Sequence, residues 1–155
     1  VGGRAGGAGR GGGAQSRPCP QRGAPRTPVP AVPAADPVRA VAHFAAKLAF
    51  ETDCDDVHTA MQGREPGFVL LDVRGPNAFA RGHVPGAVNL PHRTISDETL
   101  KPWPGDTLFV VYCAGPHCNG ADKAAAKLAA LGRKVKIMIG GLIGWQDEGF
   151  ALTGG

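Results

Sequence analysis

The chain has 155 residues, 43% of them apolar, which is enough for one domain with a hydrophobic core. No apolar run approaches the roughly 18 residues of a membrane-spanning helix, so we expect no membrane partner. The net charge of +4 lies in residues 1–37, which carry five arginines and one acidic residue, while the rest of the chain is balanced. We therefore expect no nucleic-acid partner for the domain, which lacks a basic surface.

Residues 1–37 contain 9 glycines and 7 prolines but almost no large apolar side chains. Such a segment cannot bury enough apolar surface to offset the entropy of ordering. We predict a disordered tail over 1–37 and a folded domain over 38–155. The arginine-rich tail weakly resembles a transit peptide, and an RNA-binding arm is an alternative. Because the chain does not begin with Met, we expect a fragment, a processed product or a mis-assigned start.

The first predicted element of the domain is an amphipathic helix over 38–48, preceded by Pro37. A short edge strand over 50–52 follows. Asp53 is then expected to cap a helix over 54–62, in which Cys54 is expected to pack rather than to react. Four apolar side chains share one stripe of the first helix: Val41, Phe44, Ala45 and Leu48.

The next predicted strand, over 68–73, contains Asp72 near its end and is followed by Arg74. A carboxylate and a guanidinium so placed can pair with each other and with backbone amides, so we expect them to brace the fold. A positive field from Arg74 near a functional site is the alternative. His83 lies in the tight connection to a strand over 87–90, and its imidazole is expected to satisfy backbone groups.

The chain is organised around a buried strand over 108–112, a glycine-rich loop and a helix that starts at Ala121 and stops at Gly132. Cys113 therefore follows the carboxyl end of a strand and lies near a helix N-terminus, where amide groups favour negative charge. We expect its thiol to ionise readily and to act as a nucleophile. A buried structural cysteine is the alternative.

A last strand over 135–139 precedes Gly140 and Gly141, where the backbone must approach closely or adopt positive φ. A closing helix over 142–150 follows, with Trp145 as its core anchor. Strands and helices alternate with short connections. We predict one α/β domain, with a mostly parallel central sheet of about five strands and helices on both faces.

Four cysteines, at positions 19, 54, 113 and 118, do not make a disulfide framework for a domain of this size. A reducing, cytoplasmic location fits this usage best. A zinc site built from Cys113, His117 and Cys118 would crowd three ligands into six residues, so we expect no metal and no other cofactor.

Three segments, in order and at matching spacing, resemble the rhodanese-like sulfurtransferase family. They are LLDVRGPNAFARGHVPGAVNLP at 70–91, VVYCAGPHCNGADKAAAKLAALG at 110–132 and VKIMIGGLIGWQDEGF at 135–150. The resemblance implies that Cys113 accepts a sulfane sulfur as a persulfide and passes it to a thiol or other nucleophile. The partners it implies are a small-molecule or protein sulfur donor and a thiol acceptor. The implied substrate-binding loop is Ala114, Gly115, Pro116, His117, Cys118 and Asn119.

Two other functions stay open. A cysteine phosphatase uses a similar strand, loop and helix but holds phosphate with an arginine six residues after the nucleophile, where this chain has Asn119. A non-catalytic binding or regulatory module with the same fold often lacks the cysteine, which is present here as Cys113.

The loop also raises two questions about substrate and mechanism. Between Cys113 and Gly120 it has no Arg or Lys, and His117 is the only side chain there that can carry a positive charge. We expect the thiosulfate dianion to bind weakly and persulfide donors to serve better.

Cys118 either resolves the Cys113 persulfide through an internal disulfide or fills the inner wall of the loop. We favour the second, because entry into a helix usually directs that side chain inward.

Overall fold

The computed structural model describes residues 2–3 and 28–154. The chain divides into two units, Val1–Ala35 and Asp36–Gly155. The first contains the short helix α1 (Pro28–Ala31). Most of the tail predicted to be disordered lies outside the described residues. The second unit begins two residues before the domain start predicted at residue 38, and all further elements belong to it.

The second unit is built on a sheet of five strands, all parallel to their neighbours. The strand order is β1-β5-β4-β2-β3, which places β4 at the centre. The strands are β1 (Glu51–Thr52), β2 (Val69–Asp72), β3 (Val88–Asn89), β4 (Leu108–Tyr112) and β5 (Lys134–Met138). The predicted α/β domain with a parallel five-stranded sheet is therefore confirmed.

Helices connect the strands. The elements are α2 (Pro37–Phe50), α3 (Cys54–Met61), α4 (Pro76–Arg81), the 3₁₀ turn η1 (His92–Thr94), α5 (Asp97–Leu100), α6 (Gly120–Ala130) and α7 (Gly141–Asp147). Of these, α2, α3 and α5 begin at a residue whose side chain caps the helix. Asp53 accepts a hydrogen bond from the Asp56 amide, and Ser96 forms a reciprocal capping box with Thr99. None of the described helices is long and apolar enough to cross a membrane.

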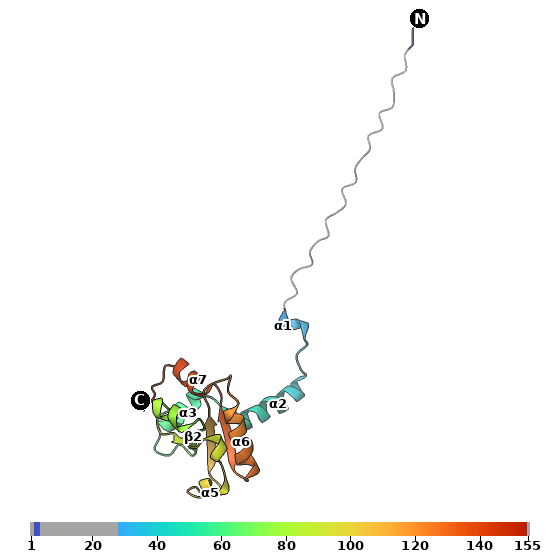
Figure 1. Cartoon of the computed structure of the whole chain (residues 1–155). Coiled ribbons are helices and arrows are strands. Elements are labelled where there is room, and N and C mark those ends of the chain that lie inside the picture. The colour runs from blue at the N-terminus through green and yellow to red at the C-terminus, as the bar shows by residue number, and fades with distance from the viewer. Residues whose placement is uncertain (1, 4–27, 155) are drawn as a thin grey trace. The chain divides into compact units, whose positions relative to one another are not determined.

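Two hydrophobic cores cover the two faces of the sheet. Along β4, Phe109 and Val111 face a core with Leu128 of α6, whereas Val110 and Tyr112 face one with Trp145 of α7. This alternation follows from the period of two in a strand. Figure 1 shows the strands between α6 on one side and α3 and α7 on the other. Both faces of β4 are therefore dry, which explains its continuous apolar sequence.

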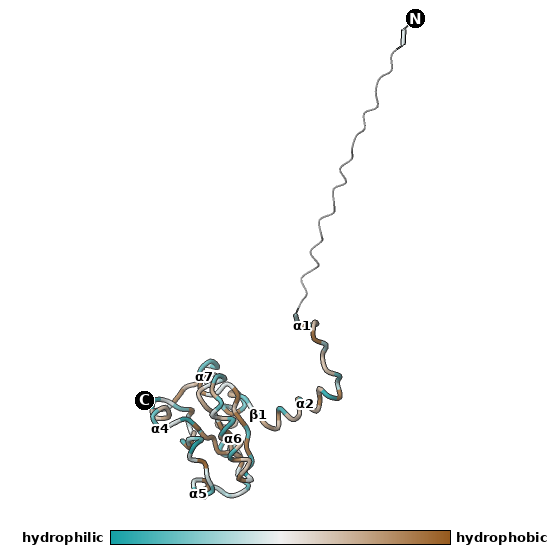
Figure 2. The backbone as a smooth tube through the Cα atoms, turned by 45° about the vertical axis from the view of Figure 1, so that its right-hand side comes forward, coloured by the Kyte–Doolittle hydropathy of each residue, from teal (hydrophilic) through white to brown (hydrophobic). Residues whose placement is uncertain are grey.

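Helix α2 forms where predicted, but its apolar stripe is uncovered. Val41, Phe44 and Leu48 are 70%, 59% and 70% exposed, and no residue of α2 is buried. The helix projects away from the other elements of its unit in Figure 1, and Figure 2 shows hydrophobic and hydrophilic segments along it. Its start is stabilised locally, because the Asp36 carboxylate accepts a 3.1 Å hydrogen bond from the Arg39 amide.

Candidate active site

Cys113 is positioned by the end of the central strand. It directly follows β4, it is only 7% exposed, and α6 begins seven residues later. Neighbouring strands β2 and β5 run parallel to β4, so their carboxyl ends meet at the same edge of the sheet. Open α/β sheets place their ligands at this edge. Cys113 therefore lies at the edge of the sheet where a ligand site is expected.

The backbone of the cysteine loop is held by the start of α7. The amides of Leu142 and Ile143 donate hydrogen bonds of 3.0 and 2.9 Å to the carbonyls of Cys113 and Ala114. Gly141 has a φ of +60°, and a Cβ there would lie 2.5 Å from the Cys113 carbonyl oxygen. Only glycine fits here, so the prediction of a close backbone approach or a positive φ at this position is confirmed.

A tight turn places Cys118 beside Cys113. A 3.0 Å hydrogen bond from the Cys118 amide to the Gly115 carbonyl closes the turn. A Cβ on Gly120 would lie 2.7 Å from Cys113 Sγ and 3.4 Å from Cys118 Sγ, so both sulfurs converge on that glycine. Cys118 is half-buried and packs against the core that contains Leu128. The Cys118 side chain therefore both fills the inner wall of the loop and lies beside the Cys113 thiol.

The two thiols titrate as a pair. Burial raises the pKa of Cys113 to about 11, the neighbouring Cys118 thiol adds to the rise, and the backbone amides of Ala114 and Gly120 oppose it. The pKa of Cys118 is lowered, chiefly by its hydrogen bond with Cys113. The first proton leaves the pair easily and the second is held, because two adjacent thiolates repel. The prediction that Cys113 ionises readily by itself is wrong, since burial outweighs the amide groups.

A cavity of about 560 Å³ opens beside both cysteines and is lined by positive side chains from three other parts of the chain. They are Arg74, which follows β2, Arg93 of η1 and Lys123 of α6. His92 lies in the same cavity, and its pKa is lowered by burial and then by the positive charges of Lys123, Arg93 and Lys127. The site therefore has a positive field.

Sequence reasoning found no Arg or Lys between Cys113 and Gly120, named a positive field from Arg74 only as an alternative, and did not anticipate Arg93. The expectation that thiosulfate binds weakly rested on the absence of a cation there, and that premise does not hold for the whole cavity. A usable signal existed: Arg93 comes just after β3, whose carboxyl end lies at the same sheet edge as that of β4.

Arg74 also belongs to a buried polar network below the cavity. Its guanidinium contacts both carboxylate oxygens of the fully buried Asp72 and donates a 2.8 Å hydrogen bond to the Gly82 carbonyl. The Tyr112 hydroxyl donates to the same carboxylate and accepts from the Val84 amide. Arg74 thus joins the segments around β2, β3 and β4 and also lines the site.

Four other predicted residues do not line this cavity: His83, Gly115, Pro116 and His117. His83 Nδ1 is 2.8 Å from the Phe79 carbonyl oxygen, and its ring stacks on Phe79. Pro116 and His117 line a more open cavity of about 480 Å³ on the outer side of the loop, together with Cys118 and Asn119. The loop residues are thus brought together around Cys118, whereas His83 supports the backbone of its own turn.

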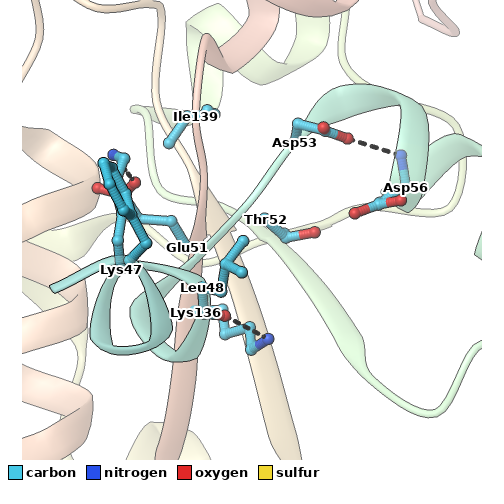
Figure 3. A pocket seen from close by; sticks show the side chains of 9 residues that line it. Lys47, Leu48, Glu51, Thr52, Asp53, Asp56, Lys136 and Ile139 are labelled. Atoms are coloured by element: carbon cyan, nitrogen blue, oxygen red, sulfur yellow. Dashed lines mark hydrogen bonds and ion pairs between the residues drawn. The ribbon is translucent and has the colours of Figure 1, made fainter. Parts of the chain in front are cut away.

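Two further features of the described residues lack the groups of a reactive site. A cavity of about 430 Å³ lies where α2 meets β1 and β5, and Figure 3 shows Leu48, Ile139 and the paired Lys47 and Glu51 around it. Its lining contains no thiol or imidazole. Within residues 28–154, no group of three or more His, Cys, Asp or Glu side chains is arranged to hold a metal ion. The cysteine cavity is therefore the candidate site.

Comparison with known proteins places the chain in a family. Residues 54–148 match the model of the rhodanese-like domain. The chain belongs to the rhodanese-like domain family. A protein of solved structure from Bacillus halodurans, BH2092, superposes with a TM-score of 0.74 at 38% identity, over 77% of this chain and 87% of that one. The rhodanese-like domain of Anabaena Alr3790 gives 0.60 at 27% identity, over 67% and 78%.

The curated relatives carry two kinds of name. The HTH-type transcriptional regulator Rv0324 of Mycobacterium tuberculosis is 35% identical over 96 residues, which are 61% of this chain and 42% of the regulator. The thiosulfate sulfurtransferase GlpE of Pseudomonas syringae is 41% identical over 69 residues, 44% of this chain and 62% of the enzyme. The chain thus spans less than two thirds of either relative.

Proposed function

We propose that this rhodanese-like domain is a sulfurtransferase that carries a sulfane sulfur as a persulfide on Cys113. The observation that carries this proposal is the placement of Cys113 at the carboxyl end of β4, beside Cys118 and in a cavity lined by Arg74, Arg93 and Lys123. A nucleophilic sulfur and a positive field are the two features that transfer from an anionic sulfur donor requires. The thiosulfate sulfurtransferases among the relatives support the same reaction class.

The first half-reaction forms the persulfide. Cys113 passes its proton to the Cys118 thiolate, and the resulting Cys113 thiolate attacks the outer sulfur of a donor such as thiosulfate. The S–S bond of thiosulfate breaks and its electron pair leaves with sulfite. Arg93 and Lys123 would face the sulfonate oxygens, because their side chains line the cavity and neither forms an ion pair with a carboxylate of the described residues.

The second half-reaction passes the sulfur on. An acceptor thiolate attacks the outer sulfur of the Cys113 persulfide, and Cys113 leaves as a thiolate that recovers its proton from Cys118. The amides of Ala114 and Gly120 favour the anionic form of Cys113 at this point. The partners are therefore a small-molecule or protein sulfane-sulfur donor and a thiol or other nucleophilic acceptor.

Mass spectrometry of the full chain after brief exposure to thiosulfate tests the proposal. We expect the mass of one sulfur atom to be added at Cys113, and turnover of thiosulfate with cyanide. Cys113→Ser should show neither, while Cys54→Ala should retain both because Cys54 lies in the other core. Turnover that persists in Cys113→Ser would refute the proposal.

A non-catalytic module is the second candidate, because a relative is named as a transcriptional regulator and the matched region covers 42% of it. Such a module would bind a partner without turning over sulfur. Absence of both the adduct and turnover in the wild-type chain would favour it.

A further inference from the structure

We propose that Cys118 is a resolving thiol, which attacks the Cys113 persulfide, forms a Cys113–Cys118 disulfide and releases hydrogen sulfide. This inference rests on the sulfur-carrying role of Cys113 and adds a second activity to it. The chain would reduce a sulfane sulfur with its own two thiols, before any external thiol acceptor binds.

The loop brings together two cysteines that an extended chain would separate. Five residues of extended backbone span roughly 16 Å. Here the turn closed by the Cys118 amide and the Gly115 carbonyl brings both sulfurs within 3.4 Å of the position that a Cβ on Gly120 would take. Both cysteines are free, and both line the 560 Å³ cavity and a second one of about 230 Å³. The attacking sulfur and its target therefore already lie in one pocket.

The positions of the two thiols fit different tasks. Cys113 is buried, whereas Cys118 is partly exposed and also lines the outer cavity with His117 and Asn119. A sulfide ion leaving from the Cys113 persulfide can pass into the 560 Å³ cavity toward Arg93 and Lys123. The positive charge there favours departure of an anion.

The step balances without an outside oxidant. Cys118 Sγ gives its proton to the outer sulfur of the persulfide and bonds to Cys113 Sγ, while the Cys113–sulfane bond breaks and its electron pair leaves with HS⁻. Two thiol sulfurs are oxidised to a disulfide and the sulfane sulfur is reduced to sulfide. A dithiol reductant would then reopen the disulfide.

The ionisation of the pair favours attack on the inner sulfur. If Cys118 attacked the outer sulfur instead, Cys113 would leave as a thiolate without a Cys118 thiol to return its proton, unlike in transfer to an external acceptor, and burial raises the pKa of Cys113 to about 11. A thiol of high pKa leaves slowly. Attack at Cys113 Sγ expels hydrosulfide, the anion of a stronger acid, so formation of the disulfide is the easier outcome.

Anaerobic single-turnover measurements on the full chain test this inference. The reduced protein is loaded with one equivalent of thiosulfate without any thiol acceptor, and sulfide release, protein mass and disulfide linkage are followed in time. In the wild type we expect the sulfur adduct to give way to a Cys113–Cys118 disulfide with one sulfide released per chain. In Cys118→Ser and Cys118→Ala we expect the adduct to persist about 10-fold longer or more, because the intramolecular attack is lost.

The outcomes separate this inference from the proposed function. An adduct that decays equally slowly in the wild type and in both Cys118 variants overturns the resolving role but leaves the sulfurtransferase intact. A disulfide that forms without stoichiometric sulfide, or that joins other cysteines, overturns it as well. Absence of any adduct in all three proteins refutes the sulfurtransferase itself. Cys54→Ala is the matched control, because it removes a thiol from the opposite core.

Discussion

The Tyr112 hydroxyl donates a 2.8 Å hydrogen bond to the buried Asp72 carboxylate, which links β4 to β2 one residue before Cys113. The same hydroxyl accepts a 3.0 Å hydrogen bond from the Val84 amide. One side chain thus connects the strand that carries the cysteine to the strand and turn beside it.

We expect Tyr112→Phe to lower the free energy of unfolding by about 1–3 kcal/mol, because it removes one donor to a buried carboxylate and the acceptor of a buried amide. Urea denaturation measures this. Asp72→Asn should cost more, because it also removes the charge that pairs with Arg74. A wild-type midpoint for Tyr112→Phe would show that the hydroxyl does not contribute to stability.

Gly120→Ala should impair the cysteine pair while leaving the fold intact. A Cβ at 2.7 Å from Cys113 Sγ forces that sulfur to shift, although alanine suits the start of α6. Persulfide formation and thiol alkylation at Cys113 should fall roughly 10-fold or more, since such a displacement disturbs the attack geometry.

Gly105→Ala is the matched control for this substitution, because a Cβ there meets nothing within 4 Å. Circular dichroism checks that both variants fold. Equal alkylation rates in the two variants would mean that the sulfur accommodates the methyl group without loss of geometry.

Arg93→Gln and Lys123→Gln should each raise the KM for thiosulfate with little change in kcat. Both cations line the cavity and are exposed, so each loss should amount to roughly 3- to 10-fold. The KM for a donor with less charge, such as an uncharged alkyl persulfide, should rise less.

Steady-state kinetics with both donors measure this difference, and Arg64→Gln serves as the control because Arg64 is exposed and does not line the cavity. An equal change in KM for both donors would show that the cations stabilise the fold rather than bind the dianion. A low thiosulfate KM that neither substitution changes would assign its binding to Arg74 or to backbone amides.

Cys54 should make the domain less stable at alkaline pH. Burial, then the charges of Asp53 and Glu148, raise its pKa from 9.0 to about 11. The unfolded state therefore loses the Cys54 proton at lower pH than the folded state does. The contribution of the buried thiol is fully present below about pH 9 and is lost as the pH rises toward about 11.

Urea denaturation under reductant at about pH 8 and about pH 10.5 checks this prediction. Cys54→Ala should show a smaller fall in stability between these two pH values than the wild type does. Identical falls would mean that other groups, such as Tyr112 and the cysteine pair, account for the alkaline dependence.

The fold was predictable because its signals are local. The run at 108–112 is apolar throughout and the residues after it contain two glycines and a proline, so a buried strand that ends in a tight turn follows from the sequence alone. The caps at Asp53 and Ser96 are local as well, since each involves residues three positions apart. The position of Cys113 between a strand and a helix was predictable for the same reason.

The uncovered stripe of α2 and the composition of the site depend on distant segments. Periodicity shows that Phe44 and Leu48 share a face, but not whether another element packs on it. Arg93 reaches the cysteine cavity because parallel pairing brings the ends of β3, β2 and β4 to one edge.

The ionisation of Cys113 was decided in the same way. The nearby amides, which are local, favour the thiolate, but the core that buries Cys113 and the turn that places Cys118 beside it determine which sulfur holds the proton. The sequence by itself determined the family, the order of the elements and the residue expected to carry sulfur. Only the tertiary structure decided the field and the partner thiol around that residue, because charge and burial act through space rather than along the chain.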